Sequence, residues 1–272
     1  HYIAKGLALR DRLGNEPLLS FCMAPHAPYT VSDATFARIG AVAEELDVPI
    51  HVHLHETEEE IAESLRRHGV RPLERLRRLG LATPRLIGVH GVHFNATEVA
   101  LLAREGCHVA HCPSSNLKLA SGLARVADLL DAGVNVGIGT DGAASNNRLD
   151  VMQETRTAAL LAKGVSGRAD VLPAHQALRC ATLAGAAALG LDARVGSVVP
   201  GKEADLTAVY LGGTETQPCF DPVSHLVYAA GREHVTHVWV RGVLRLRDRQ
   251  PAGPVARELE KRASLWHNKL LK

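Results

Sequence analysis

The sequence predicts an α/β fold of the (β/α)8 TIM-barrel class, with a small β domain after the barrel. Five short apolar runs each end in a polar cluster that carries His, Asp or Asn: "LLSFCMAPH", "VPIHVHLHE", "RLIGVHGVH", "GCHVAHCPSSN" and "VNVGIGTDG". Helical patterns lie between these runs, and strands that are apolar on both faces and alternate with helices form a buried parallel sheet. Polar residues at the carboxyl end of every strand are typical of the barrel, because its active sites lie at that end.

The opening segment, "HYIAKGLALRDRLGNEP", predicts an amphipathic helix entered partway. Five predicted strands follow it. Because a complete barrel has eight strands, we expect the chain to carry strands four to eight, and strands one to three to precede residue 1. An isolated half-barrel would expose two parallel edges, which natural proteins avoid. We therefore expect this chain to need the upstream part of the barrel.

The predicted helices between the strands have local start and stop signals. "SDATFARIGAVAEELDV" opens on Ser32, a residue that favours helix N-caps. "NATEVALLAREG" has Asn95 followed by Glu98, the capping-box pattern, and stops at Gly106. "GLARVADLLDAG" stops at Gly133.

The last third of the chain predicts a change of structure. "LPAHQALRCATLAGAAALGL" predicts one further helix. "VGSVVPGKEADLTAVYL" and "HVTHVWVRGVLRLRDRQ" then alternate as strands do, with a turn at Arg241 and Gly242. We therefore predict three parts: the barrel portion 1–193, a β domain 194–250 and a C-terminal helix 251–272.

Composition excludes several classes of protein. A net charge of +2 and an aromatic content of 4% argue against a protein that binds nucleic acid. The longest apolar stretch is too short to span a bilayer, so we expect no membrane partner and a cytoplasmic location. The odd set of cysteines lacks C-x-x-C spacing and predicts reduced, packed thiols. Fifteen histidines are the unusual feature.

The stretch "HVHLHE" predicts functional histidines at one strand end. A period of two puts His51 and His53 on the same strand face, toward the barrel interior. His55 and Glu56 fall at or beyond the strand end. Imidazole is a natural ligand for zinc, and a carboxylate beside it can transfer protons.

Two further strands deliver polar groups to the same rim. His90 closes "RLIGVH" and Asp141 closes "VNVGIGTD". Structural need explains such a cluster poorly, because a buried carboxylate is costly unless it is paired or binds a metal. The sequence therefore predicts a metal or catalytic centre at this rim.

Two segments are candidate pocket loops. "PHAPYTVS" places His26 between prolines, where we expect it to contact a substrate. "HCPSSNLKLASG" sets Ser115 and Asn116 after His111. These three residues could line the pocket or could cap the next helix, and the sequence favours neither.

Together these motifs carry a resemblance to a known family. "HAPYTVS", "HVHLHET", "GVHGVHF", "HCPSSNLKLASG", "GTDGAASNNRLDVMQE" and "VGSVVPGKEADL" resemble the amidohydrolase superfamily, and most closely its 5'-methylthioadenosine/S-adenosylhomocysteine deaminases, from about residue 20 to 245. The resemblance implies a barrel of the amidohydrolase type with a β-sandwich made from both chain ends, and usually a homo-oligomer. It also implies one divalent metal per subunit, with zinc first and iron, manganese or nickel as alternatives.

The resemblance also implies roles for individual residues. His53 and Asp141 would be metal ligands, and Asp141 would also orient the reacting water and substrate. His90 would polarise that water. Glu56 would hydrogen-bond the purine ring and move the proton, and His26 matches a substrate contact.

One departure from the family pattern is large. The H-x-H pair on the family's first strand, which supplies two metal ligands, would lie upstream of residue 1, because "HVH" leads directly into the Glu56 motif. Two ligands should not hold zinc tightly, so we expect the 272-residue chain alone to be inactive.

The activity implied for the complete enzyme is hydrolytic deamination of an adenine nucleoside to the inosine analogue and ammonia. The candidate substrates are 5'-methylthioadenosine and S-adenosylhomocysteine, with adenosine as a third. Guanine, another purine or a triazine remain as alternatives for a deaminase or chlorohydrolase. A non-catalytic binding protein on a decayed or incomplete barrel is the alternative from another class.

Overall fold

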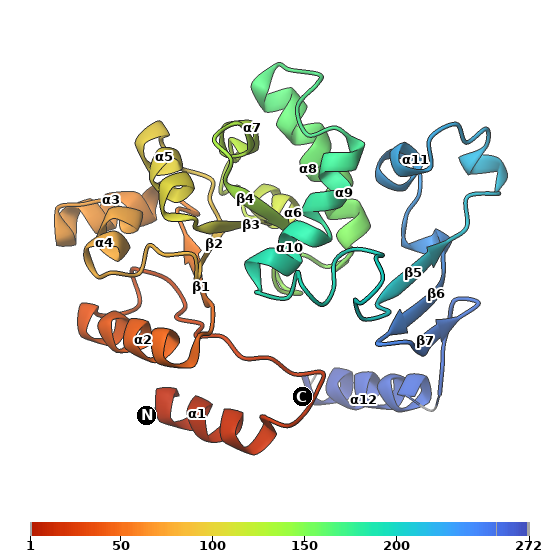
Figure 1. The fold of residues 1–272 in the computed structure, drawn as a ribbon, viewed down its shortest axis with the longest axis horizontal. Coiled ribbons are helices and arrows are strands. Elements are labelled where there is room, and N and C mark those ends of the chain that lie inside the picture. Colours follow the sequence, from red (N-terminus) through yellow and green to blue (C-terminus); the bar gives the residue numbers. More distant parts are fainter. Residues whose placement is uncertain (1, 254, 271–272) are drawn as a thin grey trace.

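Four parallel strands in sequence order form the first sheet of the computed structural model, which describes residues 2–253 and 255–270 (Figure 1). Each strand pairs with the next one along the chain, in the same direction. The carboxyl ends of all four strands therefore lie along one edge of the sheet. The strands are β1 (Ile50–Leu54), β2 (Leu86–His90), β3 (His108–His111) and β4 (Asn135–Ile138).

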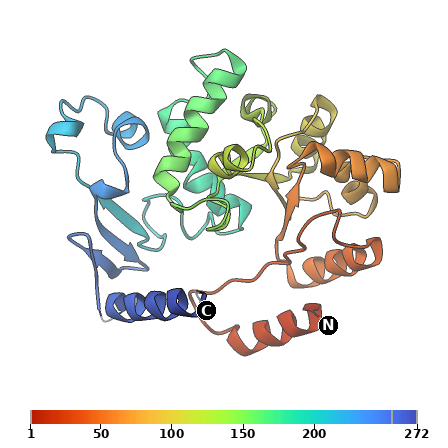
Figure 2. The same cartoon turned by 180° about the vertical axis from the view of Figure 1, so that it is seen from behind.

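Helices connect these strands and are arranged around them (Figures 1 and 2). Several predicted caps are confirmed: Ser32 accepts a hydrogen bond from the backbone of Thr35, and Asn95 and Glu98 form a complete capping box. The helices of this part are α1 (Tyr2–Leu13), α2 (Asp33–Leu46), α3 (Glu58–His68), α4 (Pro72–Arg78), α5 (Ala96–Glu105), α6 (Pro113–Lys118), α7 (Val126–Asp131), α8 (Val151–Ser166), α9 (Ala174–Cys180) and α10 (Leu183–Ala188). Within residues 2–253 and 255–270, every helix is too short or too polar to cross a lipid bilayer.

The two faces of β1 have different environments. Alternate side chains of the strand are buried in the hydrophobic core together with Phe36 of α2 and Leu76 of α4, and these strand residues are Ile50, Val52 and Leu54. Because side chains alternate across a strand, His53 points to the opposite face. Burial of one face against the helices therefore presents the histidines on the other.

The first of the five predicted strands, which ends at His26, is not a regular strand. Met23 forms a single parallel bridge with Ile50, in which the N–H of His51 donates to the Met23 carbonyl at 2.8 Å. Pro25, two residues later, has no N–H with which to continue the ladder. The next bond runs from the N–H of His53 to the carbonyl of His26 at 3.1 Å, one residue beyond the regular register. The segment therefore follows β1 without joining the sheet.

The single helix predicted over residues 172–191 is also wrong, because the chain forms α9 and α10 with a break at Ala181 and Thr182. The two helices have different partners: α9 packs against α8 and α11, whereas α10 packs on β4. The contact with β4 is close, since a Cβ added to Gly137 would lie 3.2 Å from the Cα of Gly185. The break lets each helix meet its own neighbour.

The second sheet is antiparallel, with the order β5, β6, β7, β8. Arg241 and Gly242 join β6 to β7 with positive φ angles of 52° and 75°, which confirms the predicted two-residue hairpin turn. The elements of this part are β5 (Leu206–Val209), β6 (Val235–Val240), β7 (Val243–Arg247), β8 (Gln250–Pro251), the 3-10 turns Thr214–Thr216 and Arg232–His234, α11 (Pro222–Tyr228) and α12 (Val255–Leu270).

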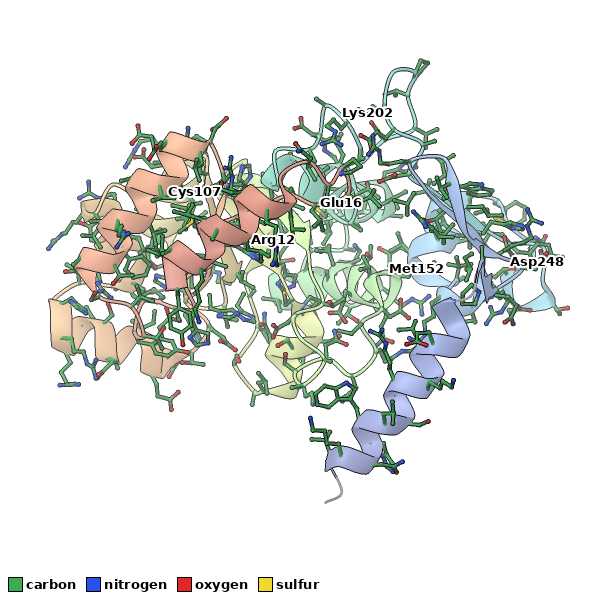
Figure 3. The ribbon with its side chains drawn as sticks, turned by 90° about the horizontal axis from the view of Figure 1, so that it is seen from below. Arg12, Glu16, Cys107, Met152, Lys202 and Asp248 are labelled. Carbon is green, nitrogen blue, oxygen red and sulfur yellow. The ribbon has the colours of Figure 1, made fainter. Side chains whose placement is uncertain are left out.

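Helix α12 extends away from the other elements (Figure 3). It lies within the predicted C-terminal segment 251–272, of which residues 254, 271 and 272 are outside the described part, as is residue 1 of the predicted barrel portion. The division of the chain at residues 194 and 251 stays a prediction.

Candidate active site

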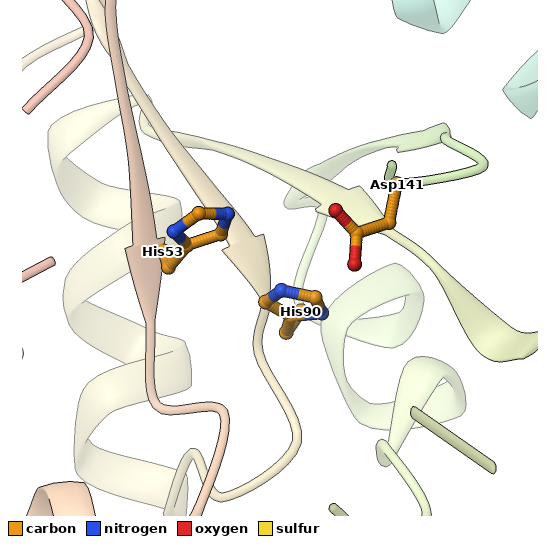
Figure 4. A group of neighbouring side chains, drawn as sticks. All are labelled: His53, His90 and Asp141. Atoms are coloured by element: carbon orange, nitrogen blue, oxygen red, sulfur yellow. The ribbon is translucent and has the colours of Figure 1, made fainter. Parts of the chain in front are cut away.

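The carboxyl edge of the parallel sheet brings three predicted site residues together. His53 comes from β1, His90 ends β2, and Asp141 follows β4 (Figure 4). One potential ligand atom from each lies within 4.8 Å of the others. The imidazole rings of His53 and His90 are stacked, with centroids 5.3 Å apart. Residues separated by more than 80 positions in the chain therefore meet at a single point.

His53 is oriented by the segment that runs beside its strand. Its Nδ1 lies 2.8 Å from the carbonyl oxygen of His26. Since a carbonyl only accepts hydrogen bonds, Nδ1 carries the proton and Nε2 is left as a potential metal ligand. Fixing the tautomer through the second ring nitrogen is the usual arrangement for a metal-binding histidine.

His90 is oriented by α6. Its Nδ1 lies 2.9 Å from Oδ1 of Asn116, and this contact is buried. An amide oxygen is also only an acceptor, so Nδ1 donates and Nε2 faces the centre. The backbone of His90 has a φ of 76°, in the left-handed region that few residues other than glycine adopt.

Asp141 is held by two serine hydroxyls. Its Oδ2 accepts hydrogen bonds from Oγ of Ser145 at 2.6 Å and from Oγ of Ser115 at 2.7 Å. Burial raises the pKa of Asp141, but the bonds from Ser145 and Ser115 outweigh burial, and the net pKa is lowered. The carboxylate is therefore ionised at neutral pH and available to a cation.

Glu56 lies next to the three residues, after the end of β1. Its Oε2 is 3.6 Å from Nε2 of His90, and its Oε1 accepts a hydrogen bond from Oγ of Ser121 at 3.3 Å. The carboxylate thus lies between an imidazole and a hydroxyl at the site. A carboxylate in this position can take a proton from one group and give it to another.

His26 is exposed beside His53, with ring centroids 5.0 Å apart. Its Nδ1 lies 3.2 Å from Oγ1 of Thr30. The residue thus contributes in two ways: its carbonyl orients His53, and its ring faces outward where a bound molecule could reach it. The sequence indicated only the second of these.

Ser115 and Asn116, for which the sequence favoured neither a pocket role nor a capping role, contact residues of the site in the structure. Ser115 and Asn116 lie inside α6, and their side chains contact Asp141 and His90, while Cys112 at the N-cap makes no side-chain cap. His111 is 2% exposed, and neither of its ring nitrogens has a hydrogen-bond partner. Burial lowers the pKa of His111 to about 4, so the ring is neutral.

Four residues at or near the site were not identified from the sequence: Ser121, Ser145, Glu60 and Glu154. Glu154 is buried on α8 and accepts hydrogen bonds from the backbone of Ser114 and the side chain of Asn146. It thereby joins α6 to the loop that follows Asp141. The only local signal was at Glu60, which follows Thr57 at capping-box spacing.

The side chains fit a divalent cation. Two imidazoles with a defined free nitrogen and one ionised carboxylate are the donor types that zinc takes in proteins. His90, which by the family resemblance would polarise the water, is close enough to His53 and Asp141 to be a third member of the group.

The fold and site together define a β/α barrel protein with a metal-binding constellation at the carboxyl edge of its strands. The sequence model of the amidohydrolase family matches residues 8–245, and the chain belongs to this family. The predicted fold class is confirmed: the chain carries part of a (β/α)8 barrel of the amidohydrolase type, represented by four parallel strands among the described residues, together with a small β domain.

Individual relatives are similar over nearly the whole chain. A 5-methylthioadenosine/S-adenosylhomocysteine deaminase of Teredinibacter turnerae is 47% identical over 269 residues, which cover 99% of this chain. The chain spans 61% of the length of that relative.

Solved structures are also similar to nearly the whole chain. The crystal structure of an adenosine deaminase from Xanthomonas campestris with bound zinc has a TM-score of 0.96 and 48% identity, over 98% of this chain and 61% of that one. An atrazine chlorohydrolase from Arthrobacter aurescens complexed with zinc has a TM-score of 0.89 and 26% identity, over 97% of this chain and 59% of that one.

Proposed function

We propose that this chain carries the proton-transfer group and part of the metal site of an enzyme that deaminates an adenine nucleoside. The observation that supports it most is the position of Glu56, whose Oε2 lies 3.6 Å from Nε2 of His90, beside the group of His53, His90 and Asp141. The names of the similar proteins, a deaminase of 5-methylthioadenosine and S-adenosylhomocysteine and an adenosine deaminase, point to the substrate class.

His53 and Asp141 would hold the metal, zinc in the first instance, and His90 stands close enough to contribute. When bound, a divalent metal supplies Lewis acidity and lowers the pKa of water toward neutrality. The lowered pKa of Asp141 keeps its carboxylate charged. The carbonyl of His26 accepts the Nδ1 proton of His53, so the lone pair of Nε2 in the neutral ring can bind the metal.

The chain's own residues account for the proton movements. Asp141 and His90 orient the attacking water toward C6 of the purine. Glu56 accepts a proton from that water and delivers it to the ring nitrogen next to C6, so that negative charge does not build up on the ring. The water oxygen forms a bond to C6, and the second proton of that water passes to the exocyclic amine. The C6–N bond then breaks, which gives the inosine analogue, with a C6 carbonyl, and ammonia.

The side chains around this centre suit a neutral heterocycle. His26 presents an exposed ring, and Ser121 donates to Glu56 without adding charge. We propose 5'-methylthioadenosine and S-adenosylhomocysteine as substrates, adenosine as a third candidate, and a homo-oligomer as the working form.

A substrate panel tests the proposal. The full-length, zinc-loaded protein is assayed for ammonia release from 5'-methylthioadenosine, S-adenosylhomocysteine, adenosine, guanine and a chlorotriazine, with Glu56→Gln alongside. We expect turnover of the adenine nucleosides, and a loss of at least about a hundredfold in kcat for Glu56→Gln with metal retained. Turnover of guanine or the triazine alone would replace the proposed substrate, and normal turnover by Glu56→Gln would remove Glu56 from the mechanism.

A further inference from the structure

The carboxylate of Glu60 closes the turn that joins β1 to α3. Its Oε1 accepts the backbone N–H of His55 at 3.1 Å, and its Oε2 accepts the backbone N–H of Glu56 at 2.8 Å. Glu60 is 4% exposed. Each of its oxygens is therefore paired with one backbone donor of the segment that carries the proposed proton-transfer group.

This arrangement differs from an ordinary helix cap. Thr57 is the N-cap of α3 and accepts the N–H of Glu60 at 3.2 Å. In a capping box the acidic residue would bond back to the N–H of the N-cap itself, and the same chain has this form at α5, where the N–H of Asn95 donates to Glu98 at 3.0 Å. Glu60 instead reaches past the N-cap to the two preceding residues.

The backbone that Glu60 holds is in an unfavourable conformation. His55 has a φ of 56°, in the left-handed region that residues with a Cβ rarely adopt. The two N–H groups that Glu60 binds, those of His55 and Glu56, flank the Cα of His55. Such a conformation persists where surrounding interactions enforce it, and it is frequent at functional sites.

We infer that Glu60 is a positioning residue for Glu56: its two backbone hydrogen bonds hold the left-handed turn that directs the Glu56 carboxylate between His90 and Ser121. The inference rests on the proposed function. Glutamine cannot replace Glu60, because one side of its amide would present a donor to a backbone N–H. Aspartate keeps both acceptors but is one methylene shorter.

The first test measures the turn itself and needs no activity. Amide hydrogen exchange is compared above pH 7, where Glu60 is ionised, between the wild-type protein, Glu60→Gln and Glu59→Gln. Glu59 lies on the same helical turn, is exposed and gives the same charge change, so it is the matched control. We expect faster exchange of the His55 and Glu56 amides in Glu60→Gln and not in Glu59→Gln. Unchanged protection of these amides in Glu60→Gln would overturn the inference.

The second test separates positioning from support of the metal site. In the full-length, zinc-loaded protein we expect Glu60→Gln to lose about tenfold or more in kcat, with KM and zinc content within about twofold of wild type. The kcat of Glu60→Asp should lie between those of wild type and Glu60→Gln. If Glu60→Gln does not fold, Glu60→Asp is used in its place. A kcat unchanged in both variants, or zinc lost in proportion to kcat, would overturn the positioning role.

The outcomes also separate this inference from the proposed function. If the wild-type protein deaminates no adenine nucleoside, the proposed function fails, and the exchange measurement still decides whether Glu60 holds the turn. If the wild-type protein is active and Glu60→Gln matches it, only the inference about Glu60 fails.

Discussion

The side-chain oxygen of Asn116 lies 2.9 Å from Nδ1 of His90, in a contact that is buried from solvent. Asn116 is on α6 and His90 ends β2, so the contact joins two elements through residues that are 26 positions apart. It fixes the ring so that Nε2 of His90 faces the site.

Asn116→Ala should weaken metal binding. Removing the acceptor leaves Nδ1 of His90 buried without a partner and frees the ring to rotate or change tautomer, and such changes around a metal ligand typically cost about 10- to 100-fold in affinity. Zinc affinity is measured by competition with a chelator. Asn15→Ala, at an exposed position, is the control. An affinity equal to that of the control would show that His90 needs no such support.

Ser145→Ala should make zinc binding more sensitive to acid. The Ser145 hydroxyl lowers the pKa of Asp141, and its removal lets protons compete with the metal at a higher pH. Zinc affinity relative to wild type should therefore fall more at about pH 5 than at about pH 8. Ser224→Ala on α11 is the control. A ratio independent of pH would mean that Ser145 does not tune the carboxylate.

Glu60 should make a contribution to stability that declines as pH rises. Burial raises the pKa of Glu60 from 4.5 to about 7, although backbone N–H bonds from Glu56 and His55 oppose the rise. Between these values the folded state keeps a proton that the unfolded state releases, so the contribution is complete below pH 4.5 and is lost by about pH 7. Each pH unit in this window changes the free energy of unfolding by up to about 1.4 kcal/mol.

The measurement is the difference in unfolding free energy between wild type and Glu60→Gln, taken by urea denaturation across this pH range. We expect the wild-type advantage to shrink with increasing pH. A difference curve identical to that of the exposed Glu59→Gln variant would contradict the prediction.

Gly137→Ala and Gly164→Ala should change stability in opposite directions. A methyl at Gly137 would lie 3.2 Å from the Cα of Gly185 and would push α10 away from β4, which typically costs about 1–3 kcal/mol. A methyl at Gly164 on α8 meets nothing within 4 Å, and alanine is the better helix former by about 1 kcal/mol. Thermal unfolding of both variants checks the pair, and a stable Gly137→Ala would show that α10 moves freely.

The sequence allowed the main site residues to be predicted because their positions depend on a single rule. Strands of a parallel sheet end along one edge, so His53, His90 and Asp141 at the ends of three apolar runs were expected to meet. The caps at Ser32 and Asn95 depend on residues within one turn of helix and were also predictable.

The features that were missed depend on how loops fold rather than on a local pattern. Ser121 bonds to Glu56, which is 65 residues away in the chain. Ser145 is only 4 residues from Asp141, but their bond depends on the path of the loop after β4. The strand predicted before His26 failed because Pro25 removes one ladder donor, and the long helix predicted after residue 171 failed because α10 must meet β4 at Gly137. In both cases the apolar pattern was read correctly, but it did not show where the backbone leaves the regular strand or helix.

The left-handed backbone at His90 and Asp141, with φ angles of 76° and 60°, restricts which proteins could be engineered from this one. Histidine, aspartate and asparagine tolerate this conformation better than other residues with a side chain, whereas most others lose roughly 1–2 kcal/mol in it. A designer who wished to change the preferred metal by introducing cysteine or glutamate at either position would face that conformational penalty before any gain in coordination. The repertoire of ligands open to redesign is therefore narrowed by the path of the main chain as well as by the chemistry of the ion.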